Sequence, residues 1–198
     1  MVAVAKPPYI TPQEYLERER AAEFKSEYCE GVIYAMSGAS VAHNRISANV
    51  TGGLWLQFRG RSCQVFSNDL KVCVENSGLY SYPDVVALCG EPQLHDRQQD
   101  VLLNPEVIVE VLSPSTEAYD RGKKFNYYQQ IATLTDYVLI SQDRICVERY
   151  QRQTDGSWRY TSHEDAEEVI HFAGLECELS LADIYDKVEF LASGVPAS

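Results

Sequence analysis

The segment Val107–Leu112 most constrains how this chain folds, because it is an apolar run with one acid at its centre, VIVEVL. A short apolar run that ends at turn residues, here residues 113–116, indicates a strand buried on both faces. Glu110 interrupts the run, and a carboxylate is costly to desolvate unless a positive group meets it. The segment therefore predicts a central strand and, on it, a functional site.

The rest of the chain predicts helices and strands that follow one another along the sequence. Thr11, Pro12 and Glu14 form a capping box that starts the first helix, and apolar residues at every fourth position mark one face of the second. Helices are expected at residues 12–22, 42–58, 121–131 and 179–185, and strands at 32–36, 63–66, 69–74, 82–88, 107–112 and 136–140.

This order of elements predicts an α/β fold with a central mixed sheet flanked by helices. Residues 145–150 and 158–160 add a peripheral β-meander, and residues 192–198 form a loose tail. We expect a single domain over residues 1–198, with its core at about residues 11–186.

Composition limits the compartment and the cysteine chemistry. No stretch approaches about 18 uninterrupted apolar residues, so no membrane span is expected, and the N-terminus gains charge too early for a signal peptide. We therefore expect a cytoplasmic protein. The six cysteines lack metal-ligand spacing and are expected to be reduced, buried thiols: Cys29, Cys63, Cys73, Cys89, Cys146 and Cys177.

The net charge of −12, from 17 basic and 29 acidic residues, argues against a protein that holds nucleic acid by electrostatics alone. It does not exclude a metal-dependent enzyme, because bound divalent cations reverse the local charge of a site.

Asp84 is a second acid at the start of an apolar strand. Pro83 has no N–H to donate and biases Tyr82 toward an extended conformation, so Asp84 lies where a sheet often opens into a cleft. Two carboxylates at the ends of neighbouring strands can share Mg²⁺, which keeps several waters and a substrate phosphate. A turn Asp and a strand-end Glu paired with one Arg are the structural alternatives.

Lys124 follows Glu110 in the chain and opens the helix predicted at residues 121–131. Phosphodiester cleavage needs an activated water and positive charge near the phosphorane. Phe125 and Tyr128 on nearby helix positions indicate that Lys124 faces inward. Arg121 is expected to grip a phosphate or to orient one of the acids.

Together these residues resemble the Uma-two family of restriction endonucleases, a branch of the PD-(D/E)xK nuclease superfamily. The resemblance covers about residues 11–185. It is carried by four motifs: Met36-Ser37-Gly38-Ala39-Ser40 with His43, Tyr82-Pro83-Asp84-Val85, the run from Glu110 to Thr116, and Asp120-Arg121-Gly122 with Lys124 and Tyr128.

The resemblance implies a restriction-endonuclease-like core with its acids on a hairpin-like strand pair, Mg²⁺ or Mn²⁺ as cofactor, and often a homodimer. Asp84 and Glu110 match the motif acids that hold the metal. The superfamily's lysine normally lies two residues after the Glu, where this chain has Leu112. The resemblance therefore points to Lys124 as the catalytic lysine, with Lys71 as the second candidate.

Four further residues are supporting candidates, and Tyr128 is one of them as part of the motif that contains Lys124. The superfamily often adds an acid from its first helix region, which implies Glu27 or Glu30, and either is alternatively a surface acid. His43 either touches a phosphate or a water at the site, or makes a structural hydrogen bond.

The leading hypothesis is a Mg²⁺-dependent endonuclease that hydrolyses phosphodiester bonds in DNA, with DNA bound transiently and with the help of the metal. One alternative is a nuclease-like fold used as a binding or assembly module without turnover. Another is a metal phosphodiesterase acting on RNA or a nucleotide.

Overall fold

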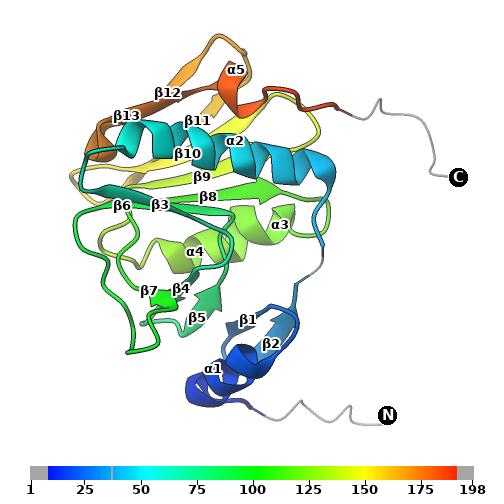
Figure 1. Ribbon diagram of the computed structural model, residues 1–198, viewed down its shortest axis with the longest axis vertical. Coiled ribbons are helices and arrows are strands. Elements are labelled where there is room, and N and C mark those ends of the chain that lie inside the picture. Colours follow the sequence, from blue (N-terminus) through cyan, green and yellow to red (C-terminus); the bar gives the residue numbers. More distant parts are fainter. Residues whose placement is uncertain (1–8, 37, 191–198) are drawn as a thin grey trace, which may run out of the picture.

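The computed structural model describes residues 9–36 and 38–190 and has a six-stranded mixed sheet at its centre (Figure 1). Only β8 and β9 pair in parallel, and the other neighbours are antiparallel. The strands lie in the order β11 (Trp158–His163), β10 (Val147–Arg152), β9 (Asp136–Ser141), β8 (Val107–Leu112), β6 (Val85–Cys89) and β3 (Cys63–Ser67).

Helices cover both faces of this sheet, as Figure 1 shows. One face carries α2 (Val41–Phe58), α5 (Leu181–Ile184) and the hairpin of β12 (Val169–Phe172) and β13 (Cys177–Ser180), joined by a 3-10 turn at Ala173–Leu175. The other face carries α3 (Glu117–Tyr119), a π-helical turn at Asp120–Lys124 and α4 (Phe125–Tyr128). The predicted α/β fold with a mixed sheet between helices is therefore confirmed.

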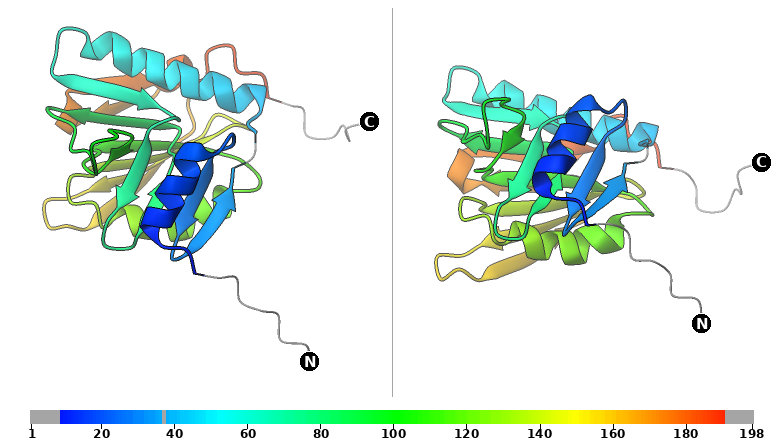
Figure 2. Two further views of the ribbon diagram at one scale, coloured as in Figure 1. Left: turned by 60° about the horizontal axis from the view of Figure 1, so that its bottom comes forward. Right: turned by 90° about the horizontal axis from the view of Figure 1, so that it is seen from below.

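A second, five-stranded sheet lies beside the α4 face and supplies part of the site. Its strands lie in the order β2 (Val32–Ala35), β1 (Ser26–Cys29), β5 (Leu79–Ser81), β4 (Lys71–Val74) and β7 (Val101–Leu102). Helix α1 (Pro12–Ala21) packs against it (Figure 2). Tyr15 stacks on Tyr28, with ring centroids 5.1 Å apart, which attaches the helix to β1.

The two long-helix predictions hold for reasons visible in the structure. Thr11 caps α1, accepting a hydrogen bond from the Glu14 N–H while the Glu14 carboxylate accepts one from the Thr11 N–H. In α2 the buried residues recur every four positions along one face: Ile46, Val50, Leu54 and Phe58.

Three elements differ from the prediction. The strand expected at residues 82–88 begins only at Val85, because Tyr82, Pro83 and Asp84 connect β5 in one sheet to β6 in the other. The helix expected from residue 121 begins at residue 117 and contains the π turn. The helix expected at residues 179–185 is the end of β13 followed by α5. Strands β1, β5, β7 and β12 were not predicted, and the predicted tail lies outside the described residues.

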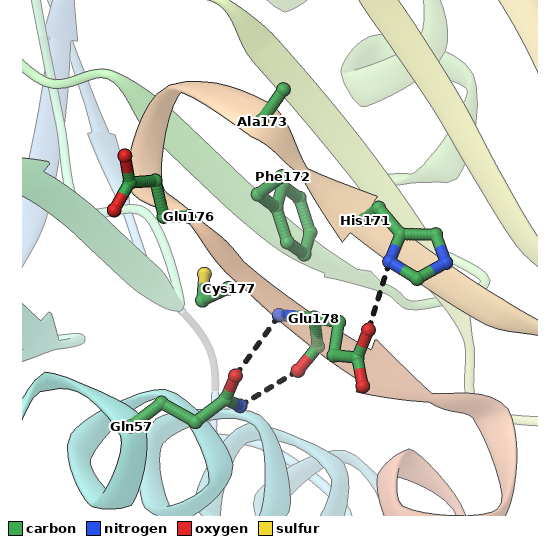
Figure 3. Close-up of a pocket in the computed structure, with 7 residues that line it drawn as sticks. All are labelled: Gln57, His171, Phe172, Ala173, Glu176, Cys177 and Glu178. Atoms are coloured by element: carbon green, nitrogen blue, oxygen red, sulfur yellow. Dashed lines mark hydrogen bonds and ion pairs between the residues drawn. The ribbon is translucent and has the colours of Figure 1, made fainter.

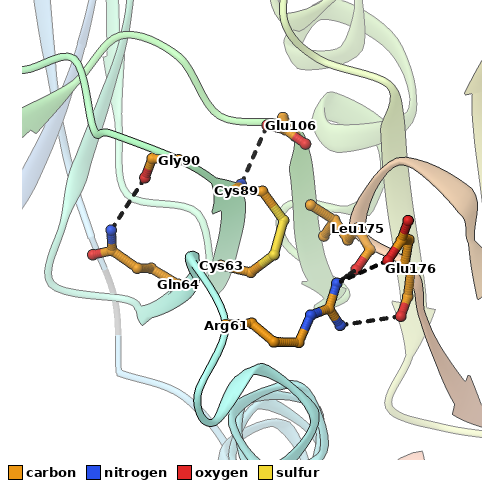
Figure 4. The surroundings of a disulfide bond; sticks show 8 residues. All are labelled: Arg61, Cys63, Gln64, Cys89, Gly90, Glu106, Leu175 and Glu176. Atoms are coloured by element: carbon orange, nitrogen blue, oxygen red, sulfur yellow. Dashed lines mark hydrogen bonds and ion pairs between the residues drawn. A yellow bond between two sulfur atoms is a disulfide. The ribbon is translucent and has the colours of Figure 1, made fainter.

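The prediction that all six cysteines are reduced thiols is wrong for two of them. Cys63 and Cys89 form a disulfide (Figure 4), because they face each other directly on the antiparallel strands β3 and β6. Cys29, Cys73, Cys146 and Cys177 are buried free thiols, as predicted. No helix within residues 9–36 and 38–190 is long and apolar enough to cross a membrane.

Candidate active site

Strand β8 presents Glu110 to the face of the sheet covered by α4. Side chains alternate along a strand, and Val107, Val109 and Val111 pack in the core under α2. Ile108 and Leu112 pack in the core on the opposite face, which is therefore also the face of Glu110. The side chain is only 5% exposed, so its charge requires partners within the protein.

Lys124 is the cation that meets Glu110. Its Nζ lies 2.9 Å from Glu110 Oε1 and 3.1 Å from Glu27 Oε1. Asp120, four residues earlier on the same π turn, has its Oδ1 at 3.6 Å. Lys124 and Asp120 are both buried, and the predicted inward orientation of Lys124 is what the structure shows.

The charges of this cluster are unbalanced. Burial raises the pKa of Glu110 well above its usual range, although Lys124 opposes this effect. Burial alone would lower the pKa of Lys124, but Glu110 and Glu27 outweigh it, so the pKa lies well above its usual range and the ammonium stays charged. Burial also raises the pKa of Asp120. The positive charge of Lys124 is therefore too small to neutralise all the acids of the cluster.

Asp84 lies next to Glu110 across two neighbouring strands. Strands β6 and β8 are antiparallel with Val85 opposite Val109, so one residue further along Asp84 lies opposite Glu110. Its Oδ2 accepts a hydrogen bond of 2.7 Å from the Val111 N–H, which fixes the carboxylate at the start of β6.

His43 joins the same carboxylate from the first turn of α2. Its Nε2 lies 3.2 Å from Asp84 Oδ2, and Ser40 caps the helix by accepting from the His43 N–H. The other ring nitrogen, Nδ1, is buried and has no hydrogen-bond partner among the described residues. The helix thus places an imidazole beside the acid, with one nitrogen still to be satisfied.

Glu27 comes to the cluster from β1 in the five-stranded sheet. Its Oε1 accepts from the Tyr82 N–H at 3.2 Å as well as from Lys124. Tyr128, at the end of α4, donates its hydroxyl to Glu110 Oε1 at 3.0 Å. The site is therefore assembled from both sheets and from helices on both faces of the six-stranded sheet.

The carboxylates leave suitable oxygens for a hard divalent cation. Glu110 and Glu27 each use Oε1, and Asp84 uses Oδ2, in the contacts given above. For the second oxygen of each, the described residues provide no hydrogen-bond partner. No group of three His, Cys, Asp or Glu side chains in that part of the chain converges as a preformed metal site. Mg²⁺ needs only one or two carboxylates besides waters and substrate phosphate, so the donor set fits such an ion.

Three of the predicted candidates lie outside this cluster. Lys71 Nζ bonds Asp100 Oδ2 at 2.9 Å and the Tyr82 hydroxyl at 3.2 Å. Arg121 bonds the carboxylates of Glu148 and Glu117. The side chain of Glu30 is mostly exposed in the β1–β2 turn, with its Oε2 3.7 Å from Lys123 Nζ. Asp84, Glu110, Lys124, Glu27, His43 and Tyr128 are brought together.

A shallow pocket elsewhere on the surface does not gather comparable groups. It lies between the end of α2 and the β12–β13 hairpin (Figure 3), and its polar side chains bind one another. Gln57 bonds the backbone of Glu178, and His171 pairs with the Glu178 carboxylate at 2.8 Å.

Two residues at the site, Asp120 and Ser81, were not predicted as candidates. Asp120 and Lys124 are four residues apart, a spacing that places two residues on one helix face and could have indicated that Asp120 also points inward. Ser81, whose Oγ lies 2.9 Å from the Tyr128 hydroxyl, gives no signal in the sequence, because its neighbours become apparent only when β5 meets α4.

The fold of this chain, a mixed sheet between helices, has a counterpart among solved structures. A crystal structure described as that of "a putative nuclease belonging to DUF820" from Anabaena variabilis has the same fold. The TM-score is 0.73 over 89% of this chain and 97% of that one, at 19% sequence identity.

The chain belongs to the Uma2 family, described as "Putative restriction endonuclease", whose model matches residues 12–183. Two Synechocystis proteins are similar to it. The protein sll1609 is 37% identical over 173 residues, 87% of this chain and 98% of that protein. The protein slr1290 is 37% identical over 163 residues, 82% of this chain and 84% of that protein. Family and fold together support a nuclease function.

Proposed function

We propose that this protein is a divalent-metal-dependent endonuclease that hydrolyses phosphodiester bonds in DNA. The observation that carries the proposal is the cluster of Glu110, Asp84 and Glu27 near Lys124, in which each carboxylate has one oxygen in contact with the protein and one without a partner among the described residues. The charge of Lys124 does not neutralise these acids, and a divalent cation would supply the missing positive charge.

Asp84 and Glu110 would hold Mg²⁺ or Mn²⁺ through their free oxygens, with Glu27 as a third acid nearby. A bound cation stabilises the charge that develops on a phosphate and makes a nearby water a better nucleophile. The protein's acids keep their positions because β6 and β8 are hydrogen-bonded neighbours, so little reorganisation accompanies binding.

Lys124 would stabilise the transition state at the same phosphate. An ammonium has three N–H donors. Lys124 Nζ donates a hydrogen bond to Glu27 Oε1 at 3.1 Å and is ion-paired with Glu110 Oε1 at 2.9 Å. Asp120 Oδ1 lies 3.6 Å from Nζ, which is too long for a hydrogen bond, so a third donor would remain for a phosphate oxygen.

Cleavage of supercoiled plasmid DNA tests the proposal. In Mg²⁺ or Mn²⁺ the wild type should nick the plasmid, and Glu110→Ala should nick it at least about 100-fold more slowly, the size of effect seen when one transition-state contact is lost. Asp100→Asn is the matched control, because it removes an ion-paired acid outside the cluster, and should stay within a few-fold of wild type. If wild type nicks no more than Glu110→Ala over a range of salt and pH, the proposal fails. A parallel assay with RNA distinguishes the two substrates.

A second candidate function is a binding or assembly module without turnover. It is favoured by the net charge of −12 and by Leu112, which stands two residues after Glu110 where the superfamily's lysine normally lies. Calorimetric titration with Mn²⁺ separates the two functions. A metal affinity that requires both Asp84 and Glu110 supports the nuclease, and no binding at millimolar concentration supports the module.

A further inference from the structure

Two fully buried hydroxyl groups stand behind Glu110. Tyr128 and Ser81 are both 0% exposed, and their oxygens lie 2.9 Å apart. The Tyr128 ring packs edge-on against Tyr137, with centroids 5.3 Å apart, so the hydroxyl is held in place by the core.

The hydrogen bonds between these groups have one consistent direction. The Tyr128 hydroxyl donates its single proton to Glu110 Oε1 at 3.0 Å. The Ser81 hydroxyl must therefore donate to the Tyr128 oxygen, because each hydroxyl carries only one proton. A chain of two hydroxyls thus runs from β5 in the five-stranded sheet to Glu110 on β8, and such chains strengthen the final bond.

This chain determines which oxygen of Glu110 remains available. Oε1 accepts the hydrogen bond from Tyr128 and is ion-paired with Lys124 Nζ at 2.9 Å, so both contacts hold the same oxygen of the carboxylate. Oε2 has no hydrogen-bond partner in the described part of the chain. Without the Tyr128 hydroxyl, Lys124 alone would hold the group, and the carboxylate could rotate between its two oxygens.

We propose that Ser81 and Tyr128 are positioning residues that hold Glu110 with Oε2 directed at the cation site. This inference rests on the proposed metal-dependent function and extends it to a group outside the metal's direct ligands. Partners of metal-ligating groups affect affinity by orienting the ligand, and their loss typically weakens binding by about 10- to 100-fold.

Calorimetric titration of the full-length chain with Mn²⁺ tests the inference. Tyr128→Phe keeps the packed ring and removes the hydroxyl, so it should weaken Mn²⁺ binding by about 10-fold. Ser81→Ala leaves the Tyr128 donor in place and should weaken binding by a smaller factor. Added to Tyr128→Phe, it should cause no further loss of affinity, because Ser81 acts through the Tyr128 hydroxyl.

Tyr185→Phe is the matched control. It also removes a buried hydroxyl, but one that bonds the backbone of Cys146 and Ser141 on the opposite side of the sheet. Thermal unfolding should show similar losses of stability for Tyr128→Phe and Tyr185→Phe, while only Tyr128→Phe loses Mn²⁺ affinity.

Three outcomes overturn the positioning role while leaving the nuclease proposal intact: Tyr128→Phe binds Mn²⁺ as tightly as wild type, Tyr185→Phe loses as much affinity, or Ser81→Ala adds a further loss to Tyr128→Phe. If wild type itself binds no Mn²⁺ at millimolar concentration, the metal-dependent function and the positioning role both fail.

Discussion

Two buried lysines of this protein lie in acidic surroundings that differ in charge balance. Lys71 bonds Asp100, and Arg20 bonds both Asp100 and Asp96. Two permanent cations thus share this group of acids. Lys124 is in contact with Glu110, Glu27 and Asp120. No other cation among the described residues contacts these three acids.

The pKa values of the acids shift in opposite directions in the two networks. Hydrogen bonds from Arg20, together with Lys71, lower the pKa of Asp100 to about 2. Burial raises the pKa of Glu110, and Asp120 and Asp84 raise it further. Asp100 is therefore stabilised as an anion in the folded protein, whereas Glu110 is not.

This difference separates a structural ion network from a candidate active site. A balanced network connects α1, β4 and the segment before β7 without needing another charge. A network with too few cations takes up further positive charge, a proton or a metal ion, more readily, and perturbed acids of this kind cluster at functional sites. We therefore expect that only the Lys124 network responds to a divalent metal.

The largest expected effect comes from removing each lysine in turn. Lys124→Met leaves buried acids without their cation and should lower the free energy of unfolding by about 3 kcal/mol or more. Lys71→Met leaves Asp100 paired with Arg20 and should cost less. Urea unfolding with and without Mn²⁺ measures both effects, and Mn²⁺ should restore stability to Lys124→Met by mass action. Lys71→Met keeps the Lys124 network, so Mn²⁺ should stabilise it only as much as it stabilises wild type, and should stabilise Lys124→Met more. Equal stabilisation of the two variants by Mn²⁺ would contradict the difference between the two networks.

A smaller effect on the free energy of unfolding is expected at acidic pH. Because the pKa of Asp100 is about 2 in the folded protein against 3.8 ordinarily, the ionised group favours the folded state above pH about 4. This contribution, roughly 1–2 kcal/mol, is lost as the pH falls from about 4 to 2. Urea unfolding across this range should show a shallower pH dependence for Asp100→Asn than for wild type. Equal slopes would show that Arg20 and Lys71 do not stabilise the charged carboxylate.

Much of the fold was predictable because it depends on local patterns. The apolar run at β8, the four-residue spacing in α2 and the capping box of α1 each reflect a physical preference of neighbouring residues. The division between β5 and β6 was signalled by Pro83, but the sequence could not show that the two strands join different sheets.

The candidate site was predicted in part, and the remainder depends on contacts between distant segments. Asp84, Glu110 and Lys124 were identified from strand ends and a helix face. The π turn was not, because the extra residue in its hydrogen-bonding pattern has no sequence signature as strong as a cap. Glu27 became a partner of Lys124, and Ser81 a partner of Tyr128, only through the packing of the five-stranded sheet on α4.

The decisive experiment is a crystal structure of the protein with Mn²⁺, in which the ion is located by its anomalous scattering. We expect one Mn²⁺ that contacts Glu110 Oε2 and Asp84 Oδ1, with Lys124 still bonded to Glu110 Oε1. An anomalous peak only at other residues, or none at millimolar Mn²⁺, would contradict the claim that this acidic cluster is a metal-dependent nuclease site.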